Sequence, residues 1–361
     1  MARFLVGLLE GEGIGPQLID GCVALLEALG VRFGHRFDCR YGGVIGTDAV
    51  RRHGTALSAE VVRFCEDLFA AGAPVLAGAG GGRFVYDLRR VFDLFYKVNP
   101  LHGFSELIPP GQGARADFDV LVLRENLGGL YQGEAEEVVG PRGRAMRYTL
   151  THTAADVRRF LDVAFRLAEE RRGRLHLVLK PGGLPEVTRF WVAEAEQLAA
   201  GRRCEWGVLE VDYAAYRLLR EPESLDVLAA PNCFGDILAD LGGHLGGSRG
   251  LTYGGSFSAT GAAVYQTNHG AAYDLAGTDR ANPVGQMLAL AYLLRESLEL
   301  PHCATAIERA IRDTWAAGYV TEDLAAAGGR VVSTSELTRR IADRITNDAS
   351  DHEAAPVRRC A

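Results

Sequence analysis

Hydrophobic and polar positions follow two different periods along the chain, and their alternation predicts helices packed on a sheet. Short apolar runs of the kind found in buried strands lie at 74–77, 119–123, 175–179, 207–211 and 226–229. Between and after them, apolar residues recur every three or four positions, as on helices, at 155–171, 189–200, 235–243, 284–297, 303–317 and 335–346. Strands that alternate with helices build layered proteins, so we expect an α/β fold.

The start of the chain predicts a strand, a turn and a helix. Residues 1–10 form an apolar run that meets a charge and a glycine too early for a signal peptide, and they read as a strand. The glycines of 11–15 suit a turn, and Pro16 is well placed at the first position of a helix. A Rossmann unit begins in a similar way, but Pro16 stands where its fingerprint needs a third glycine. We therefore do not expect a Rossmann fold.

Length and composition narrow the class of protein. A chain of 361 residues suggests two domains, and 48% hydrophobic with 24% charged residues is typical of a globular protein in water. A net charge of −7 argues against a nucleic-acid partner, and no apolar run approaches the roughly 20 residues that cross a membrane. Seven cysteines without a CxxC pair argue against a disulfide framework and favour the cytoplasm. Residues 347–361 are polar and unpatterned, so we expect a loose tail.

A pair of carboxylates at helical spacing is the clearest candidate for chemistry. Asp236 and Asp240 lie four positions apart, which stacks them on one face of a helix. Like charges so placed repel each other unless a cation lies between them. Asp212 adds a third hard oxygen ligand, of the kind that Mg²⁺ or Mn²⁺ accepts. Taken alone, such a pair is more often a solvated helix face.

The residues around this pair resemble a known family. The run Pro-Asn-Cys-Phe-Gly-Asp-Ile-Leu-Ala-Asp at 231–240 is similar to the Asn-x-x-Gly-Asp-x-x-x-Asp metal motif of the β-decarboxylating dehydrogenases. That family comprises isocitrate, 3-isopropylmalate, homoisocitrate and tartrate dehydrogenases. The opening Gly-Glu-Gly-Ile-Gly-Pro at 11–16 also resembles the family pattern, and the resemblance extends to about Leu293.

The resemblance implies an isopropylmalate dehydrogenase-like fold of two domains. A large cofactor-binding domain would combine 1–97 with 248–346, and a small domain of 98–247 would carry metal and substrate residues and pair two subunits. The family forms homodimers with shared active sites. Lys180 and Asp212 would therefore reach into the site of the neighbouring chain.

Two catalytic residues follow from the same resemblance. Tyr131 matches the acid that returns a proton to carbon after CO₂ has left. Lys180 matches the base that helps to remove the hydroxyl proton, and burial and a nearby metal would lower its pKa. Lys97 and Lys180 are the only lysines among 39 basic residues, and only an ammonium group readily gives up a proton.

Substrate recognition is implied at two other motifs. Arg89 and Arg124 match the arginines that hold substrate carboxylates, a task that suits the planar guanidinium fork. The substituent at C3 of the substrate would be read just ahead of the first arginine. Val85 and Tyr86 favour an apolar or mixed pocket there, closer to isopropylmalate than to isocitrate.

The run 269–277, followed by 281–283, resembles the adenosine loop of the family. The residues expected to contact NAD are His269, Gly270, Ala271, Ala272, Asp274 and Asn282. A carboxylate at Asp274 can accept a hydrogen bond from a ribose 2′-hydroxyl and would repel a 2′-phosphate. We therefore expect NAD rather than NADP.

Four departures from the family pattern lie close to the chemistry. Asn99 replaces a substrate-binding arginine, and Lys97 would lie on the same face if their segment is a strand. The hypothesis is that Lys97 returns the missing charge. After Lys180, the run Pro-Gly-Gly at 181–183 replaces Ala-Asn and so lacks the asparagine that contacts the nicotinamide. Gln266 replaces a glutamate near that ring, and 252–258 replaces a leucine- and proline-bearing loop.

The sequence thus predicts an NAD- and metal-dependent dehydrogenase of a 3-substituted malate-like 2-hydroxy acid, with β-decarboxylation to a 2-oxo acid. The departures favour a substrate other than the housekeeping one. Two alternatives stay open at this point. One is a dehydrogenase that does not release CO₂, and the other is a silent regulatory paralogue, against which the three aspartates, Lys180 and Tyr131 speak.

Overall fold

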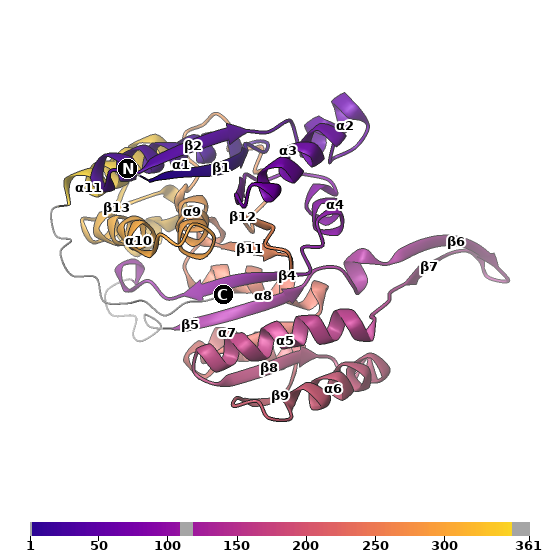
Figure 1. Cartoon of the computed structure of the whole chain (residues 1–361). Helices are drawn as coiled ribbons and strands as arrows, with labels where there is room; N and C mark the ends of the chain where they lie inside the picture. The colour runs from indigo at the N-terminus through magenta and orange to yellow at the C-terminus, as the bar shows by residue number, and fades with distance from the viewer. Residues whose placement is uncertain (1, 109–117, 349–361) are drawn as a thin grey trace.

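One continuous sheet runs through the molecule. The computed structural model describes residues 2–108 and 118–348. Within them, ten strands are ordered β2-β1-β3-β12-β11-β4-β5-β10-β8-β9, from the top to the bottom of Figure 1. Their bounds are β1 (Arg3–Leu9), β2 (Arg36–Tyr41), β3 (Val75–Ala77), β4 (Tyr96–His102), β5 (Asp119–Glu125), β8 (Arg174–Leu179), β9 (Glu205–Glu210), β10 (Val227–Ala230), β11 (Tyr253–Phe257) and β12 (Ala263–Thr267).

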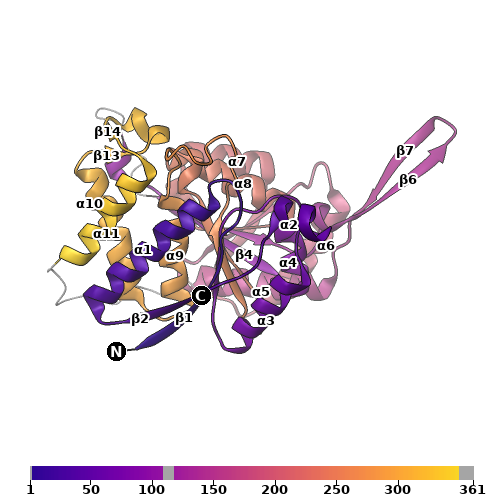
Figure 2. The same cartoon turned by 90° about the horizontal axis from the view of Figure 1, so that it is seen from above.

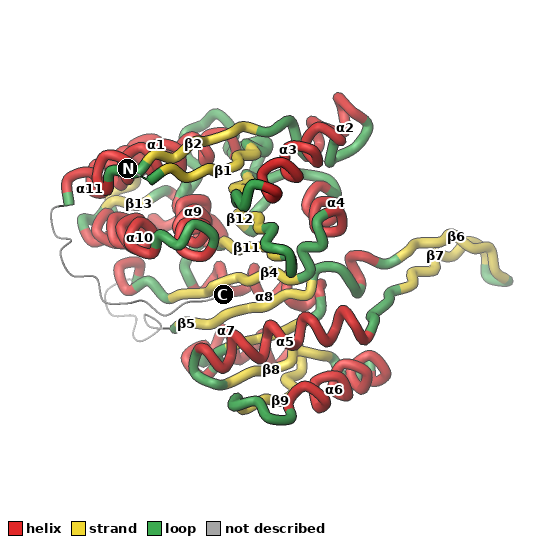
Figure 3. The backbone as a smooth tube through the Cα atoms, in the orientation of Figure 1, coloured by secondary structure: helices red, strands yellow, loops and turns green. Residues whose placement is uncertain are grey.

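Helices cover both faces of this sheet (Figure 3). Those of the first half are α1 (Gly15–Phe33), α2 (Gly46–His53), α3 (Ala59–Ala70), α4 (Phe84–Val91), α5 (Ala154–Glu170) and α6 (Pro185–Ala199). Those of the second half are α7 (Val211–Arg220), α8 (Asn232–Leu245), α9 (Val284–Glu296), α10 (Pro301–Ala316) and α11 (Thr334–Asn347). Short 3-10 turns are η1 (Ser105–Leu107), η2 (Leu130–Gln132), η3 (Pro222–Ser224), η4 (Arg249–Leu251) and η5 (Glu322–Ala327).

Alternating side chains of the strands divide between two hydrophobic layers. In β1, Val6 and Leu8 are buried in the same core as the apolar faces of α1 and α9. Leu9 belongs instead to the core that includes residues of α3 and α4. Successive strand residues point to opposite faces, so one strand serves both layers. Figure 2 shows α1, α9, α10 and α11 gathered on one side of the molecule and α3 and α4 on the other.

The central strand β4 runs antiparallel to both neighbours, β5 and β11. This register sets Lys97 of β4 opposite Arg124 of β5. Most other pairings in the sheet are parallel. The two neighbours of β4, β5 and β11, come from distant parts of the chain, so side chains far apart in the sequence lie next to one another at β4.

A long hairpin projects from the body of the molecule (Figures 1 and 2). Its strands, β6 (Glu134–Gly140) and β7 (Gly143–Thr149), pair only with each other and are exposed along almost their whole length. A second small pair, β13 (Tyr319–Val320) with β14 (Arg330–Val331), lies near α10 and α11.

The predicted α/β fold class is confirmed, and every predicted strand and helix is present within a few residues. The helix predicted to begin near Pro16 is α1, and its apolar stripe of Leu18, Ile19, Cys22, Leu25 and Leu26 is buried. Val211, placed at the end of a strand, instead begins α7. The domain boundaries near 97 and 247 stay a prediction. Of the predicted tail, 349–361 lie outside the described residues, and Asn347 still belongs to α11.

Candidate active site

Side chains from four elements meet at one end of the β4–β5 pair. Lys97 of β4 faces Arg124 of β5, Arg89 comes from α4, and Asp236 of α8 forms an ion pair with Arg124. Gly235 allows this approach, because a Cβ atom there would lie 2.8 Å from Cβ of Arg124. The structure thus brings together the residues predicted to bind substrate and one of those predicted to bind metal.

Two buried arginines in this cluster carry hydrogen-bond donors without an acceptor. Arg89 is 3% exposed, and its Nε and Nη1 atoms have no partner among the described residues. The same holds for Nη2 of Arg124. Burial and the charge of Arg124 lower the pKa of Arg89 to about 9. Because a buried charged donor without a partner is costly, the arrangement is suited to an anion with several oxygen atoms.

Lys97 and Asn99 lie side by side on one face of β4, against Gly254 of β11. A Cβ atom on Gly254 would lie 2.9 Å from Cε of Lys97 and 2.8 Å from Oδ1 of Asn99. Lys97 donates a hydrogen bond to Oδ1 of Asn268. Burial, followed by the charges of two neighbouring arginines, lowers the pKa of Lys97 well below its usual value. The segment is a strand, as the hypothesis about Lys97 requires, and the role of this lysine stays a prediction.

Tyr131 lies in η2, beside the same arginines. Its ring is 5.7 Å from the ring of Tyr86, and the guanidinium of Arg124 lies 5.5 Å from its centroid. Burial and a hydrogen bond with Cys233 raise the pKa of Tyr131. The phenol therefore keeps its proton near neutral pH and can act as an acid.

Val85 and Tyr86 precede Arg89 on α4 by four and three positions. Residues at these spacings share one face of a helix, so both point toward the side that carries the guanidinium. Both are half-buried. Their position agrees with the expected pocket for an apolar substituent, and the assignment stays a prediction.

The carboxylate pair of α8 stands at the rim of the cluster. Asp236 pairs with Arg124, and Asp240 pairs with Arg249 at 2.7 Å. Each side chain is 40% exposed. Burial raises the pKa of Asp240, and the charge of Arg249 opposes that shift. Two hard oxygen donors at this spacing fit a divalent cation such as Mg²⁺ or Mn²⁺.

Lys180 and Asp212 lie apart from this cluster. The Nζ atom of Lys180 is 2.9 Å from Glu210 and 2.9 Å from Asp212. The hydrogen bond with Glu210, followed by that with Asp212, raises the pKa of Lys180, opposite to the expected direction. In the described part of one chain, Asp212 does not join Asp236 and Asp240 in a common metal-binding group. Their expected place in the site of a partner chain stays a prediction.

Two further residues hold the site together, and the sequence did not single them out. Asn232, at the start of α8, accepts a 2.9 Å hydrogen bond from Nε of Arg124 and donates one of 2.8 Å to the carbonyl of Asn126. Glu125 accepts hydrogen bonds of 2.6 and 2.8 Å from backbone N–H groups of the loop that leads to η2. Burial raises the pKa of Glu125 to about 7. Asn232 opens the metal motif, which was the available signal, whereas Glu125 had none beyond its place next to Arg124.

The predicted adenosine loop borders a cavity of about 390 Å³. The carbonyl of Ala271 accepts a 2.9 Å hydrogen bond from the backbone of Ile14, which fastens the loop to the first glycine-rich turn. Gly13 permits this contact, because a Cβ there would lie 2.0 Å from that oxygen. Asp274 is exposed and does not line the cavity. The predicted residues that do line it are His269, Gly270, Ala272 and Asn282.

Fold and site together present a cluster of cationic donors beside a carboxylate pair, an arrangement that suits a small anionic acid. The model of the isocitrate/isopropylmalate dehydrogenase family matches residues 5–341. The chain therefore belongs to this family and is an NAD-dependent decarboxylating dehydrogenase with an isopropylmalate dehydrogenase-like fold. The predicted resemblance is confirmed.

Individual relatives agree with this assignment. The chain is 35% identical to a 3-isopropylmalate dehydrogenase of Geobacillus kaustophilus over 94% of this chain and 95% of the relative. It is 34% identical to that of Carboxydothermus hydrogenoformans, over 96% of both chains. Among solved structures, an isocitrate dehydrogenase from Methylococcus capsulatus has a TM-score of 0.83 at 29% identity, covering 95% of this chain and 100% of that one.

Proposed function

We propose that the protein oxidises a 3-substituted malate-like 2-hydroxy acid with NAD and a divalent metal ion, and that decarboxylation yields a 2-oxo acid. The observation that carries this proposal is the pair of buried arginines with unpaired donors beside the carboxylates of α8. A substrate with two carboxylates would supply the missing acceptors. The same dianion would balance the positive charge of Arg89, Arg124 and Lys97.

The substituent at C3 would be apolar, as in isopropylmalate. Val85 and Tyr86 supply apolar surface on the face of α4 that carries Arg89. The curated relatives named above are 3-isopropylmalate dehydrogenases, which supports this class of substrate. Asn99 on β4 stands where the family has a substrate-binding arginine, so we expect a substrate that differs from isopropylmalate in the part that would lie next to β4.

The metal ion would be held by Asp236 and Asp240, with Asp212 from a partner chain. When bound, Mg²⁺ or Mn²⁺ would polarise the oxygen at C2 and stabilise negative charge there. NAD would be bound by the loop of 269–282, with Asp274 toward the ribose, and it would accept the hydride from C2. Asp274 lies outside the cavity of the single chain, so its contact with the ribose rests on the loop pattern.

The proton transfers would fall to residues of this chain. Lys180 would accept the hydroxyl proton, which requires the ammonium to lose its proton first, and its pKa is raised in the single chain. A metal ion that drew Asp212 away from Lys180 would remove the smaller part of that shift, and the part due to Glu210 would remain. Tyr131, which keeps its proton because of burial, would deliver it to C3 after CO₂ has left.

A homodimer in the cytoplasm would complete the enzyme. The β6–β7 hairpin is two strands wide and meets no other sheet, and such hairpins are only marginally stable alone in water. Its exposed apolar residues, Val139 and Met146, and those of the helices that carry the aspartates, Tyr213, Tyr216 and Ile237, would be covered by a second copy. The six cysteines that the structure describes are free thiols, which agrees with a reducing compartment.

The experiment is a panel of 3-substituted malates and tartrates assayed for NADH and CO₂, with and without Mg²⁺ or Mn²⁺. The proposal predicts metal-dependent formation of NADH and CO₂ in equal amounts, highest with an apolar substituent. NADH without CO₂ would instead support a dehydrogenase that does not decarboxylate, the alternative motivated by Asn99 in place of an arginine. No NADH from any member of the panel would contradict both.

A further inference from the structure

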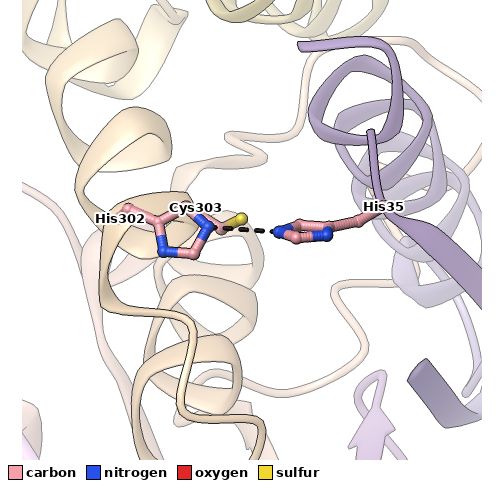
Figure 4. A group of neighbouring side chains, drawn as sticks. All are labelled: His35, His302 and Cys303. Atoms are coloured by element: carbon pink, nitrogen blue, oxygen red, sulfur yellow. Dashed lines mark hydrogen bonds between the residues drawn. The ribbon is translucent and has the colours of Figure 1, made fainter. Parts of the chain in front are cut away.

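Two histidines and a cysteine meet outside the elements that carry the active site (Figure 4). His35 lies between α1 and β2, directly after Gly34, whose left-handed backbone ends α1. His302 and Cys303 lie in the first turn of α10. Their potential ligand atoms all lie within 4.8 Å of one another. Among the described residues, no other His, Cys, Asp and Glu side chains form such a group of three.

The spacing of these atoms is close to that of a tetrahedral metal site. The Nε2 atoms of His35 and His302 are 3.2 Å apart. Two nitrogens at about 2.0–2.1 Å from a zinc ion are separated by roughly 3.3–3.4 Å, and a nitrogen and a thiolate by roughly 3.6 Å. The two imidazoles therefore already stand at nearly the right separation, and the sulfur, which lies within 4.8 Å of both nitrogens, would move closer when a metal binds.

Aromatic rings fix the orientation of the imidazoles. Phe4 meets His35 edge-on at 5.4 Å, and Phe33 meets His302 in the same way at 4.9 Å. Both histidines are half-buried, which leaves a path for an ion from solvent, and Cys303 is buried behind them. Rings held in place by packing lose little freedom when they bind a metal.

Burial disfavours the thiolate form of Cys303, and a nearby positive charge partly offsets this effect. Burial raises the pKa of the Cys303 thiol to about 12, and the nearby Arg32 opposes that shift. Arg32 is itself paired with Asp348 at 3.4 Å, so its charge is partly compensated. Without a metal the thiol keeps its proton, and binding would displace that proton to solvent as the metal–sulfur bond forms.

We infer that His35, His302 and Cys303 form a binding site for one divalent transition-metal ion of the zinc class. Two imidazoles and one thiolate suit Zn²⁺ or Co²⁺, whereas Mg²⁺ and Mn²⁺ prefer the oxygen ligands of the active site. A fourth position would be left to water or another small ligand. The ion would tie the connection between α1 and β2 to α10 and so stabilise this part of the fold.

The distance of 3.2 Å between the two Nε2 atoms also fits a hydrogen bond from one imidazole to the other. The test must therefore distinguish a metal site from such a hydrogen bond. Full-length protein is stripped with a chelator and titrated with Co²⁺ in the presence of excess Mg²⁺. A cobalt ion gives thiolate-to-metal charge-transfer absorption only when a cysteine binds it. The site predicts this absorption with about one equivalent of Co²⁺, its loss on addition of Zn²⁺, and a higher melting temperature with Zn²⁺.

Single substitutions show which side chains bind the ion. Cys303→Ser should abolish the charge-transfer absorption, and His35→Gln, at a half-buried position, should weaken Co²⁺ binding by about 100-fold. Matched controls are Cys39→Ser, on the same strand that follows His35, and Cys233→Ser, beside the active-site aspartates, and both should retain the absorption. No charge-transfer absorption in the wild type would overturn the inference. So would absorption that persists in Cys303→Ser or His35→Gln, or that disappears in Cys233→Ser.

Discussion

Arg89, Arg124 and Lys97 place three cationic groups in one buried corner of the molecule, where, among residues 2–108 and 118–348, only Asp236 forms an ion pair with them. Burial lowers the pKa of Arg89 and of Lys97, because a cation is less stable in a buried position than in water. A dianionic substrate reverses this cost, since its carboxylates supply both charge and acceptors. Substrate affinity should therefore depend on each of these side chains.

Lys97→Met tests whether this lysine replaces the charge lost at Asn99. The side chain keeps a similar volume but cannot donate to a carboxylate, so the KM for the acid should rise about 10- to 100-fold, with a smaller effect on the KM for NAD. Steady-state kinetics for both substrates measure the change. Arg90→Met is the matched control, because Arg90 is exposed and bonds Gln132. An unchanged KM in Lys97→Met would remove the lysine from the site.

Glu125→Gln tests the buried carboxyl that supports the loop of Tyr131. The pKa of Glu125 rises from 4.5 to about 7 on folding because of burial, so between these values the folded chain holds a proton that the unfolded chain has lost. The wild type should therefore lose stability as pH rises through this window. Each unit of difference between the folded and unfolded pKa corresponds to about 1.4 kcal/mol, so the free energy of unfolding should fall by roughly 3 kcal/mol between pH 4 and pH 8.

The glutamine does not titrate and still offers an oxygen to the same two backbone N–H groups. The free energy of unfolding of Glu125→Gln minus that of the wild type should increase as pH rises from 4 to 8, because only the wild type loses stability. Denaturant unfolding at several pH values gives this difference directly. A difference that stays constant with pH would show that Glu125 is ionised at the same pH in both states.

Helix α8 connects the proposed substrate-binding arginine to the proposed metal-binding carboxylates. Asn232 at its start holds Arg124, and Asp236 and Asp240, one and two turns later, are the proposed metal ligands. Gly235 brings the helix against β5, since any side chain there would strike Arg124. The distance between the substrate arginines and the carboxylate pair is therefore set by this one contact.

Gly235→Ala should push α8 away from β5. We expect a loss of stability of about 1–3 kcal/mol from overpacking, together with weaker binding of Mn²⁺ and of the substrate. Thermal unfolding and metal titration measure the two effects. Gly207→Ala in β9 is the control, because a Cβ there meets no atom within 4 Å. Wild-type metal affinity in Gly235→Ala would show that the position of α8 does not control the site.

The elements differ in how far the sequence could predict them. Helices α8 and α9 have long periodic patterns, and their position was predicted closely. Strand β4 contains Lys97, Asn99 and Pro100, and polar residues with a proline do not form the apolar run that indicates a buried strand. In the structure all three residues are buried, so the pattern of polar positions was misleading there. The contact of Asn232 with Arg124 joins positions 108 apart in the chain and depends on packing that no local pattern encodes.

At the scale of the whole molecule, the sheet order is the feature that residue patterns could least anticipate. Strands β11 and β12, late in the chain, insert between β3 and β4, so the chain must return to complete the sheet around the site. Within one chain, Lys180 and Asp212 also lie apart from Asp236 and Asp240. Both pairs are well defined within the described chain, yet the first is presented outward, with the Asp212 side chain 69% exposed.

The central claim is that each active site combines α8 of one chain with Lys180 and Asp212 of another. Two inactive variants, Lys180→Met and Asp236→Asn, are co-expressed with different tags, and the heterodimer is purified through both. One of its two sites would then contain intact residues from each chain, so about half of the wild-type activity per dimer should return. The matched control is the heterodimer of Lys180→Met with Asp212→Asn, which leaves no intact site and should stay inactive. A Lys180→Met and Asp236→Asn heterodimer as inactive as its parents would contradict a shared site.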